Sequence, residues 1–530
     1  MILLVGNVEV EDPQADVRPE VAQRLGLVLA QVAEAQVVRR SLDARHRKQV
    51  WRVVCRVTLA DGVAAPDAPG VRPWSRKDDA RYGLVDAAPE RRRWPADTRV
   101  IVVGAGPAGL FAALHLAEAG APVLLVDRGG PTPERVRAVN GFWRRKLPMD
   151  ANNNLLFGEG GAGTFSDGKI YTRRRDGDVG YILRRFVDFG ARADILEEGW
   201  AHLGTDKVRA ILPVFRARLE ALGVEVRYHA EVTRLMVQGG RAVGVGFADG
   251  AEALGSHIIV APGHSARDTV RMMIEAGAQA VARPIAIGAR VEHPQSAIDR
   301  IRYGPERGEL PAASYRLAYH PKHGVKARTF CMCPGGMVVP AMNADARVVV
   351  NGMSFAAQRG HWANSAIIVE VEPQAYGGEG PLAGYAWQDA IEARAFEAGG
   401  GDFAAPGQRV TDFMAGTRSA QLPAVSYPFG ARAAELREVL PPAVVQGMVQ
   451  ALQAFNQEMP GFVSADAVLM APETRTTSPV RLLRGPTCES HGLPGLYPVG
   501  EGAGFGGGIV SCALDGLRAA RGIAGDTESA

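Results

Sequence analysis

The chain has 530 residues, 47% of them hydrophobic, so it can bury a large core and form two or three structural units. Its 60 lysines and arginines nearly balance 57 aspartates and glutamates, which disfavours nucleic-acid binding through overall charge. Five cysteines and no charged leader before an apolar segment favour a reducing, cytoplasmic setting, and we expect no membrane span.

Residues 1–95 are predicted to form a small ferredoxin-like α+β module that ends in a linker. The stretches "ILLVGNVEVE", "QVVRRSLDA" and "VWRVVCRVTLA" alternate as strands do, and "RPEVAQRLGLVLAQV" has helical spacing. The stretch from Ala64 to Asp97 is rich in proline and arginine and is interpreted as the linker. Packing is the favoured role of the module because its charge is mixed, and the arginine clusters at 91–93 and 173–175 leave RNA binding as an alternative.

The segment from Arg99 to Asp127 predicts a dinucleotide-binding βαβ unit. A buried strand, "RVIVVG", leads into "GAGPAG", then a helix, "LFAALHLAEAG", and a second strand, "PVLLVDR". In such a unit the three glycines permit a tight turn, close approach of a pyrophosphate, and close packing of the helix, while the terminal acid accepts ribose hydroxyls. The predicted cofactor contacts here are Gly104, Gly106, Pro107, Ala108, Gly109, Asp127 and Arg128.

The stretch "NNNLLFGEGGAGTFSDGKIYTR", residues 152–173, is too rich in glycine for a regular helix or strand and too apolar for a solvated linker. Long loops without a function are uncommon in compact domains. A functional loop is therefore favoured over a glycine-rich surface turn.

Two later segments decide which dinucleotide is expected. After a predicted β-meander, "VEVRYHAEVTRLMVQGGRAVGVGFADG", the stretch "SHIIVAPGHSARDT" resembles a strand and turn of flavoproteins. The segment "GLYPVGEGAGFGGGIVSCALDGLRAARGI" predicts a strand, an acidic glycine turn and a helix from near Gly508. Gly500 and Glu501 resemble the glycine and acid that the glutathione-reductase superfamily places near the ribityl and phosphate region of FAD. A second full fingerprint is missing from the sequence, so NAD(P)H is expected only as a transient electron donor.

Residues 283–464 contain the strand signals "PIAIGARVEH", "RVVVNGMSF" and "SAIIVEVEP" before a helix-rich part, and are predicted to form a substrate or cap domain. Substrate is expected between the domains. Cys331 and Cys333 match no common zinc spacing, even with Cys488 and His491 as partners, so no metal is predicted. Whether these two thiols are redox-active stays open.

Ten motifs in a fixed order resemble the bacterial family of uncharacterized FAD-dependent dehydrogenases over almost the whole chain. They are "RSLDARHRKQVWRVVCRV", the fingerprint, the glycine-rich stretch, "HLGTDKV", "APGHSARDT", "IGARVEHPQSAID", "RTFCMCPGG", "NGMS", "ETRTTSPVR" and "VGEGAGFGGGIVS". The stretch "HWANSAIIV" and the extra glycine at 506–508 depart from the usual pattern. These departures concern substrate contacts and leave the expectation of FAD unchanged.

The resemblance implies an α/β fold with a Rossmann-like, glutathione-reductase-type FAD-binding domain at 96–282 and 465–530, an inserted α+β cap at 283–464, and the module at 1–95. It implies noncovalent FAD and a glycine-rich loop against the isoalloxazine ring. The further predicted contacts are Gly160, Gly161, Gly163, Thr164, Val232, Ala261, Gly263, Gly500, Glu501, Gly507, Gly508 and Ile509.

Three side chains are candidates for the chemistry. Lys169 is expected to stabilise the anionic reduced flavin, and Arg475 to clamp a substrate carboxylate, with an ion pair to Glu473 as its alternative. His264 is a candidate acid or base, although a structural histidine beside the glycine turn is favoured.

The predicted function is that of an FAD-dependent oxidoreductase, which passes a hydride at flavin N5 to or from a small organic substrate. Two other readings remain: a flavoprotein that binds or modifies RNA, and a flavin-binding structural or sensor protein. The sequence does not give the substrate, the direction of the reaction or the oligomeric state.

Overall fold

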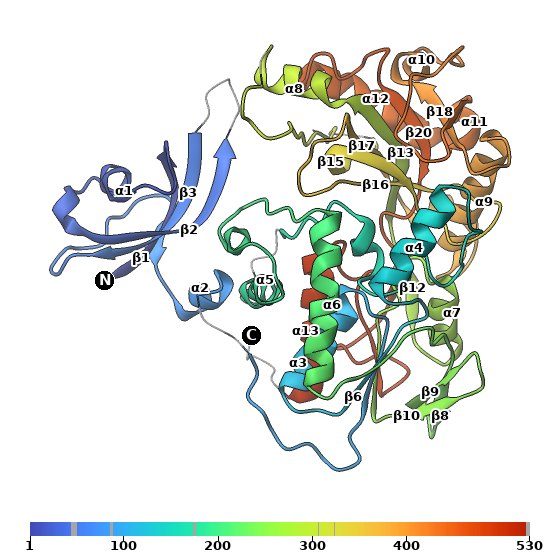
Figure 1. Ribbon diagram of the computed structural model, residues 1–530, viewed down its shortest axis with the longest axis horizontal. Coiled ribbons are helices and arrows are strands. Elements are labelled where there is room, and N and C mark those ends of the chain that lie inside the picture. Colours follow the sequence, from blue (N-terminus) through green and yellow to red (C-terminus); the bar gives the residue numbers. More distant parts are fainter. Residues whose placement is uncertain (44–49, 85–87, 173–175, 306, 323, 526–530) are drawn as a thin grey trace. The chain divides into compact units, whose positions relative to one another are not determined.

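The computed structural model describes residues 1–43, 50–84, 88–172, 176–305, 307–322 and 324–525. The chain divides into two compact units, which are described separately. The first contains residues 1–88, 169–202 and 302–306, and the second contains the rest (Figure 1). The predicted boundaries at 95/96, 282/283 and 464/465 are not tested by this division and stay predictions.

The first unit is built on a four-stranded antiparallel sheet of order β2-β3-β1-β4. Its inner face is apolar, with Leu3, Val5, Val53 and Val57 fully buried against α1. The strand order is that of a ferredoxin-like fold, but residues 60–70, between β3 and β4, contain no helix. The elements of this unit are β1 (Ile2–Val10), α1 (Arg18–Leu25), β2 (Val32–Asp43), β3 (Val50–Leu59), β4 (Val71–Pro73), α2 (Arg76–Arg81) and α5 (Asp178–Asp188).

The prediction of a linker from Ala64 to Asp97 is wrong in part, because β4 and α2 lie inside it. The Asp78 carboxylate accepts a hydrogen bond from the Ser75 amide (2.9 Å) at the start of α2. It is also held by two bonds from the Arg72 guanidinium (2.6 and 2.8 Å), and this guanidinium is the main cause that lowers the pKa of Asp78. A capped helix start thus stands where proline and arginine content suggested a linker.

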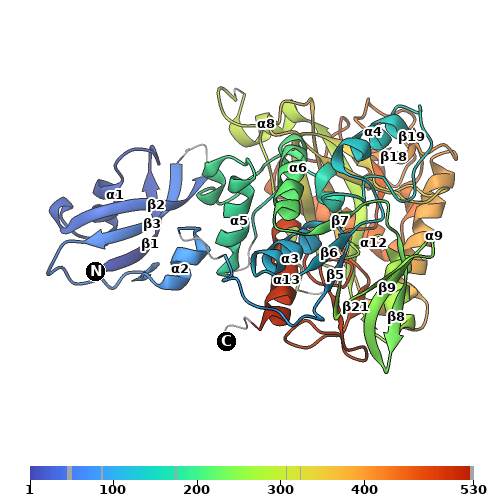
Figure 2. The same cartoon turned by 60° about the horizontal axis from the view of Figure 1, so that its bottom comes forward.

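The second unit contains a five-stranded parallel sheet of order β22-β11-β5-β6-β7 (Figure 2). Its central strands are buried on both faces, as the unbroken apolar runs in the sequence predict. Helices α3 and α13 lie side by side against it. The elements are β5 (Val100–Val103), α3 (Pro107–Glu118), β6 (Val123–Val126), α4 (Thr132–Trp143), α6 (Thr205–Ala221), β7 (Glu225–Arg227), β11 (His257–Val260), α7 (Arg267–Glu275), β22 (Leu496–Pro498) and α13 (Ile509–Ala524).

Two smaller sheets accompany the parallel sheet. The predicted meander is the three-stranded antiparallel sheet of β8 (Val232–Gln238), β9 (Arg241–Phe247) and β10 (Glu252–Leu254). A two-stranded ribbon is formed by β12 (Ala280–Ala282) and β21 (Val480–Leu482).

A large, mainly antiparallel sheet of order β14-β15-β17-β13-β20-β18-β19, with β16 paired to β15, covers the region predicted as the cap. No helix among the described residues has the length and apolarity to cross a bilayer. The elements are β13 (Ile285–Pro294), α8 (Gln295–Tyr303), β14 (Ala318–Tyr319), β15 (Ala327–Pro340), β16 (Val350–Met353), β17 (Trp362–Val371), α9 (Ala383–Ala398), β18 (Ala405–Arg409), α10 (Val410–Ala415), β19 (Ala431–Ala433), α11 (Leu436–Val439), α12 (Pro442–Glu458) and β20 (Val468–Glu473).

Candidate functional site

The three fingerprint glycines occupy positions with different steric demands. Gly104 has φ +105°, and a Cβ there would lie 2.3 Å from the Ala261 carbonyl oxygen. A Cβ on Gly109 would lie 1.8 Å from the Gly104 carbonyl oxygen, so the helix and the turn can approach only without side chains. At Gly106 the nearest atom to a Cβ is Gly161 Cα, 3.8 Å away. The space beside Gly106 is open to a ligand.

The start of α3 presents backbone donors that no described residue accepts. The helix has no side-chain cap, and the amides of Ala108 and Gly109 are buried without a partner among the described residues. Buried amides are normally paired, and a helix N-terminus favours an anion. The residues here fit a phosphate group of a dinucleotide.

Asp127 connects this turn to the glycine-rich loop. Its Oδ2 accepts the Ala105 amide (2.7 Å), and its Oδ1 accepts the amides of Gly129 (2.8 Å) and Gly158 (3.0 Å). These contacts make Asp127 a structural link, and its ribose contact stays a prediction. Neighbouring Arg128 is also engaged, because it donates to the Asp268 carboxylate at 2.8 Å.

The glycine-rich loop is held from inside by Arg135, a residue of α4 that sequence reasoning missed. Arg135 is fully buried and donates to the carbonyl oxygens of Asn154 (2.7 Å), Leu155 (2.6 Å) and Glu159 (2.7 Å) and to Thr164 Oγ1 (2.9 Å). Burial lowers the pKa of Arg135 to about 9, while the charges of Asp127 and Glu159 act in the opposite direction. The fork of the guanidinium therefore sets the path of the loop.

Glu159, also missed, fixes the loop to the beginning of α4. Its buried carboxylate accepts the Thr132 amide (2.7 Å) and hydroxyl (2.6 Å) and the Tyr228 hydroxyl (2.7 Å). Burial, followed by the charge of Glu159, raises the pKa of Tyr228. The only sequence signal for both residues was an apolar loop too short to contain its own donors.

The tip of the loop meets the fingerprint and the C-terminal helix. A Cβ on Gly161 would lie 3.1 Å from Gly106 Cα, and one on Gly163 would lie 3.2 Å from Ile509 Cγ1. The Gly160 amide donates to the Ala105 carbonyl at 2.8 Å. Thr164 is fully buried and its hydroxyl faces Arg135, so only its backbone remains for a cofactor.

The C-terminal turn reaches the same place. The Gly500 amide donates to the buried Asp515 carboxylate (2.8 Å), and a Cβ on Gly500 would lie 3.1 Å from Ala108 Cβ. Gly507 and Gly508, before α13, are exposed, with open space on their Cβ side. The structure thus brings together the start of α3, the glycine-rich loop and the start of α13.

His264 and Glu501, two predicted site residues, face one another. His264 Nδ1 lies 3.5 Å from Glu501 Oε2, and their side chains are 10% and 21% exposed. A Cβ on Gly502 would lie 2.2 Å from the Gly263 carbonyl oxygen, so the two turns pack closely. Val232 and Ala261 are buried, so a contact from either residue would come from its backbone or a small side-chain surface.

Arg475 does not have the partner expected for it. Its guanidinium forms a two-bond ion pair with fully buried Glu392 (3.0 and 2.7 Å) and donates to Asn343 Oδ1 (2.6 Å), whereas Glu473 pairs with Arg290. The alternative of a Glu473 ion pair is wrong. With its donors directed at protein acceptors, Arg475 is placed as a structural residue and not as a free clamp for substrate.

Three further calls have separate outcomes. Lys169 is half-buried and belongs to the first unit, and its catalytic role stays a prediction. Arg92 of the first arginine cluster donates to the Ala524 carbonyl and lies over Trp94, whereas residues 173–175 lie outside the described residues. Cys331 has φ +45° in a bulge of β15, and the Cys333 thiol lies 3.8 Å from Asp167 Oδ2.

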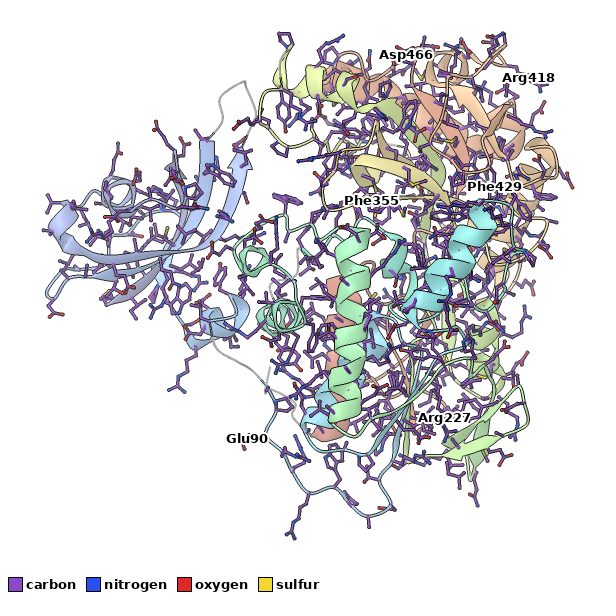
Figure 3. All side chains as sticks on the ribbon, in the orientation of Figure 1. Glu90, Arg227, Phe355, Arg418, Phe429 and Asp466 are labelled. Carbon is purple, nitrogen blue, oxygen red and sulfur yellow. The ribbon has the colours of Figure 1, made fainter. Side chains whose placement is uncertain are left out.

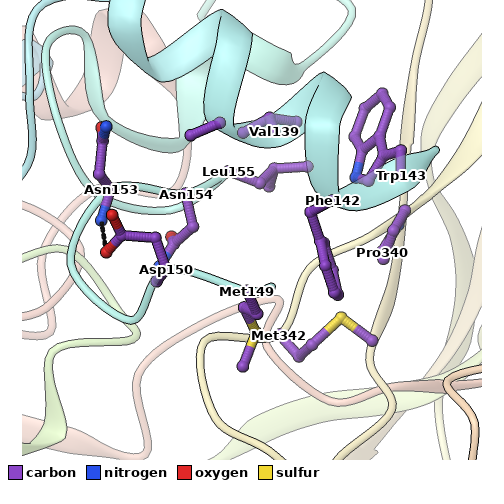
Figure 4. A pocket seen from close by; sticks show the side chains of 11 residues that line it. Val139, Phe142, Trp143, Met149, Asp150, Asn153, Asn154, Leu155, Pro340 and Met342 are labelled. Carbon is purple, nitrogen blue, oxygen red and sulfur yellow. Dashed lines mark hydrogen bonds between the residues drawn. The ribbon is translucent and has the colours of Figure 1, made fainter. Parts of the chain in front are cut away.

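A small pocket lies beside the loop, between α4 and the end of β15 (Figure 4). Its wall is mainly apolar, with Phe142 and Met342 on facing sides. The polar side chains at one end are Asp150, Asn153 and Asn154, and no basic side chain lines it.

The parallel sheet, the glycine turns and the unpaired amides define a dinucleotide-binding protein of the Rossmann type. Residues 97–142 match a family described as FAD binding domain, and residues 284–476 match the family "FAD-dependent protein, C-terminal domain-like". Residues 2–58 match a domain of unknown function, DUF8436.

A protein of Clostridium beijerinckii, described as uncharacterized, is 35% identical over 526 residues, which are 98% of this chain and 97% of that protein. The chain belongs to the same family, an uncharacterized family of FAD-dependent proteins.

Solved flavoprotein structures show more distant similarity. A flavin-dependent brominase, Bmp2, is 14% identical with a TM-score of 0.37, and covers 81% of this chain and 80% of its own. The Escherichia coli quinol fumarate reductase FrdA is 13% identical with a TM-score of 0.37, and covers 82% and 71%. A 3-ketosteroid dehydrogenase of Rhodococcus jostii is 13% identical with a TM-score of 0.33, and covers 82% and 98%. These similarities do not identify a reaction.

Proposed function

We propose that this protein is an FAD-dependent oxidoreductase that transfers a hydride between noncovalently bound FAD and a small organic substrate. The observation that carries the proposal is the meeting of three sequence-distant glycine segments around the buried, unpaired amides of Ala108 and Gly109. FAD, when bound, supplies a two-electron acceptor and donor.

The chain's own residues have separate tasks in this proposal. The amides at the start of α3 would bind the pyrophosphate, and those at the start of α13 would face the other end of the cofactor. The loop from Gly160 to Gly163 approaches the cofactor with backbone alone, and Arg135 keeps it in place. His264 would hold a proton on Nδ1 toward Glu501 Oε2 at the edge of the site.

The glutathione-reductase type is also proposed for the FAD domain. Its support is the three-stranded meander that lies in the chain between β7 and β11 of the parallel sheet. No described residue contact specifically favours the RNA alternative, because Arg92 is already bonded within the protein.

An anaerobic absorbance titration of the purified protein with NADH and then NADPH tests the proposal. Rapid bleaching of the flavin band would identify a reductase fed by nicotinamide, and its organic acceptor would then be sought. A flavin that only dithionite or an organic substrate reduces would identify a dehydrogenase. A protein that neither contains FAD nor binds it after purification would refute the proposal, as would bound flavin that exchanges electrons with no organic partner.

A further inference from the structure

Two arginines converge on the glycine turn that precedes α13. Arg283 Nη1 donates to the Gly504 carbonyl oxygen at 2.6 Å, and Arg481 Nη2 donates to the same oxygen at 3.3 Å. A carbonyl oxygen can satisfy only a small part of the ten N–H donors that two guanidinium groups carry. Two like charges are therefore held together with most of their donors unused by the described residues.

The ribbon of β12 and β21 explains why both side chains reach this place. Val281 lies opposite Arg481 in the antiparallel pair, and Arg283 follows two residues later, with its amide bonded to the Pro479 carbonyl at 2.9 Å. Residues two apart in an extended strand share a face, as do cross-strand partners. Arg283 and Arg481 therefore project from the same face of the ribbon toward the turn.

The charge of this pair is not balanced by a close carboxylate. Among the described residues, neither guanidinium has a carboxylate within ion-pair distance, whereas nearby Arg484 is paired with Asp515 at 2.5 Å. Burial and the charge of Arg481 lower the pKa of Arg283, and Glu501 acts in the opposite direction. Glu501 is itself 3.5 Å from His264 Nδ1.

The turn adds further positive potential. Gly507 and Gly508 are exposed at the start of α13, a helix of 16 residues whose first turn has no side-chain cap. Two guanidinium groups beside a helix N-terminus suit a dianionic, tetrahedral group better than a single carboxylate.

We propose that Arg283 and Arg481 form an anion-binding site for the phosphoryl group of an organic ligand. The ligand is either a nicotinamide dinucleotide, through its pyrophosphate or 2′-phosphate, or a phosphorylated substrate. The site lies beside the turn that forms part of the proposed FAD site, but binding of an anion there requires no redox reaction.

Calorimetric titration of the FAD-loaded protein with inorganic pyrophosphate, in a phosphate-free buffer of low ionic strength with excess FAD, tests the site. Loss of one charged hydrogen-bonding partner should weaken pyrophosphate binding by about tenfold or more in Arg481→Gln and in Arg283→Gln. Arg481 is exposed, so its variant should fold even if Arg283→Gln does not.

Arg418→Gln is the matched control, because Arg418 is an exposed arginine that donates singly to a backbone carbonyl, Ala433, at 2.8 Å (Figure 3). It should bind pyrophosphate as the unchanged protein does. Absence of pyrophosphate binding in the unchanged protein, or equal binding by the Arg481 and Arg418 variants, would overturn the site.

Titrations with NADH and NADPH then separate the two sources of the phosphoryl group. Dinucleotide binding that weakens in Arg481→Gln identifies a nicotinamide donor, and NADPH binding more tightly than NADH assigns the site to the 2′-phosphate. Pyrophosphate binding without dinucleotide binding identifies a phosphorylated substrate. None of these results depends on turnover, so the anion site and the oxidoreductase proposal can fail independently.

Discussion

Replacement of Arg135 by methionine tests whether α4 holds the glycine-rich loop. Methionine keeps much of the apolar stem but removes every donor, which leaves the carbonyl oxygens of Asn154, Leu155 and Glu159 buried without their bonds of 2.6 to 2.7 Å. Three such charged bonds have a gross value of roughly 4 to 9 kcal/mol. Relief of the desolvation of a fully buried guanidinium offsets part of this, so we expect a net loss of about 3 to 5 kcal/mol.

Hydrogen exchange followed by mass spectrometry measures this loss where it occurs. Protection of peptides covering residues 153–165 should fall by roughly 10² to 10⁴, since each 1.4 kcal/mol corresponds to about one power of ten. Retention of FAD after gel filtration should fall in parallel. Lysine at position 135 should give an intermediate effect, because its three donors leave from one nitrogen and cannot match the fork of arginine.

Arg137→Met is the control, because Arg137 is exposed on the same helix two residues away. It should leave both the exchange and the FAD content unchanged. Unaltered protection of residues 153–165 in Arg135→Met, with α4 intact, would show that the loop does not depend on the guanidinium and would refute the reasoning.

Three further predictions concern other parts of the second unit. Gly106→Ala should preserve the fold but weaken FAD retention, whereas Gly109→Ala should unfold the βαβ unit because its Cβ would lie 1.8 Å from a carbonyl oxygen; circular dichroism and the FAD-to-protein ratio distinguish the two. Burial raises the pKa of Glu292 to about 7, so its neutral form is favoured on folding, and stability should fall by up to about 3 kcal/mol as the pH rises from about 4.5 through 7; melting temperatures from pH 5 to 8 should show this fall in the unchanged protein and not in Glu292→Gln, and parallel profiles would contradict it. Glu392→Gln should lower thermal stability by about 3 to 5 kcal/mol because two arginines lose their buried carboxylate, while Glu397→Gln, exposed on the same helix, should have little effect; equal melting temperatures would exclude the role.

The βαβ unit was predictable because its signals are local. An unbroken apolar run fixes the buried strand, and the steric positions of Gly104 and Gly109 depend only on the turn that they form. The C-terminal strand and helix were predictable for the same reason. The expectation that the glycine-rich loop carries no regular helix holds apart from a short 3-10 turn, Gly161–Phe165.

The partners of buried charges were not predictable, because they depend on register and tertiary packing. Glu473 and Arg475 are two residues apart and looked like a pair in the sequence. The pairing of β13 with β20 instead brings Arg290 to Glu473, and α9 brings Glu392 to Arg475. A single-sequence pattern contains neither the register of β13 nor the rotation of α9.

The same argument explains why a loop with so many glycines can be a defined structure. Glycine raises the entropy lost when a loop is ordered, so a rigid glycine loop needs strong contacts from elsewhere. Here those contacts come from the carboxylates of Asp127 and Glu159 and from the guanidinium of Arg135, all buried behind the loop. The face toward Gly106 and Ile509 remains free of large side chains. The charged residues behind the loop thus allow the glycines in front of it to leave room for a flat ligand, and loss of Arg135 should affect cofactor binding through the position of the loop.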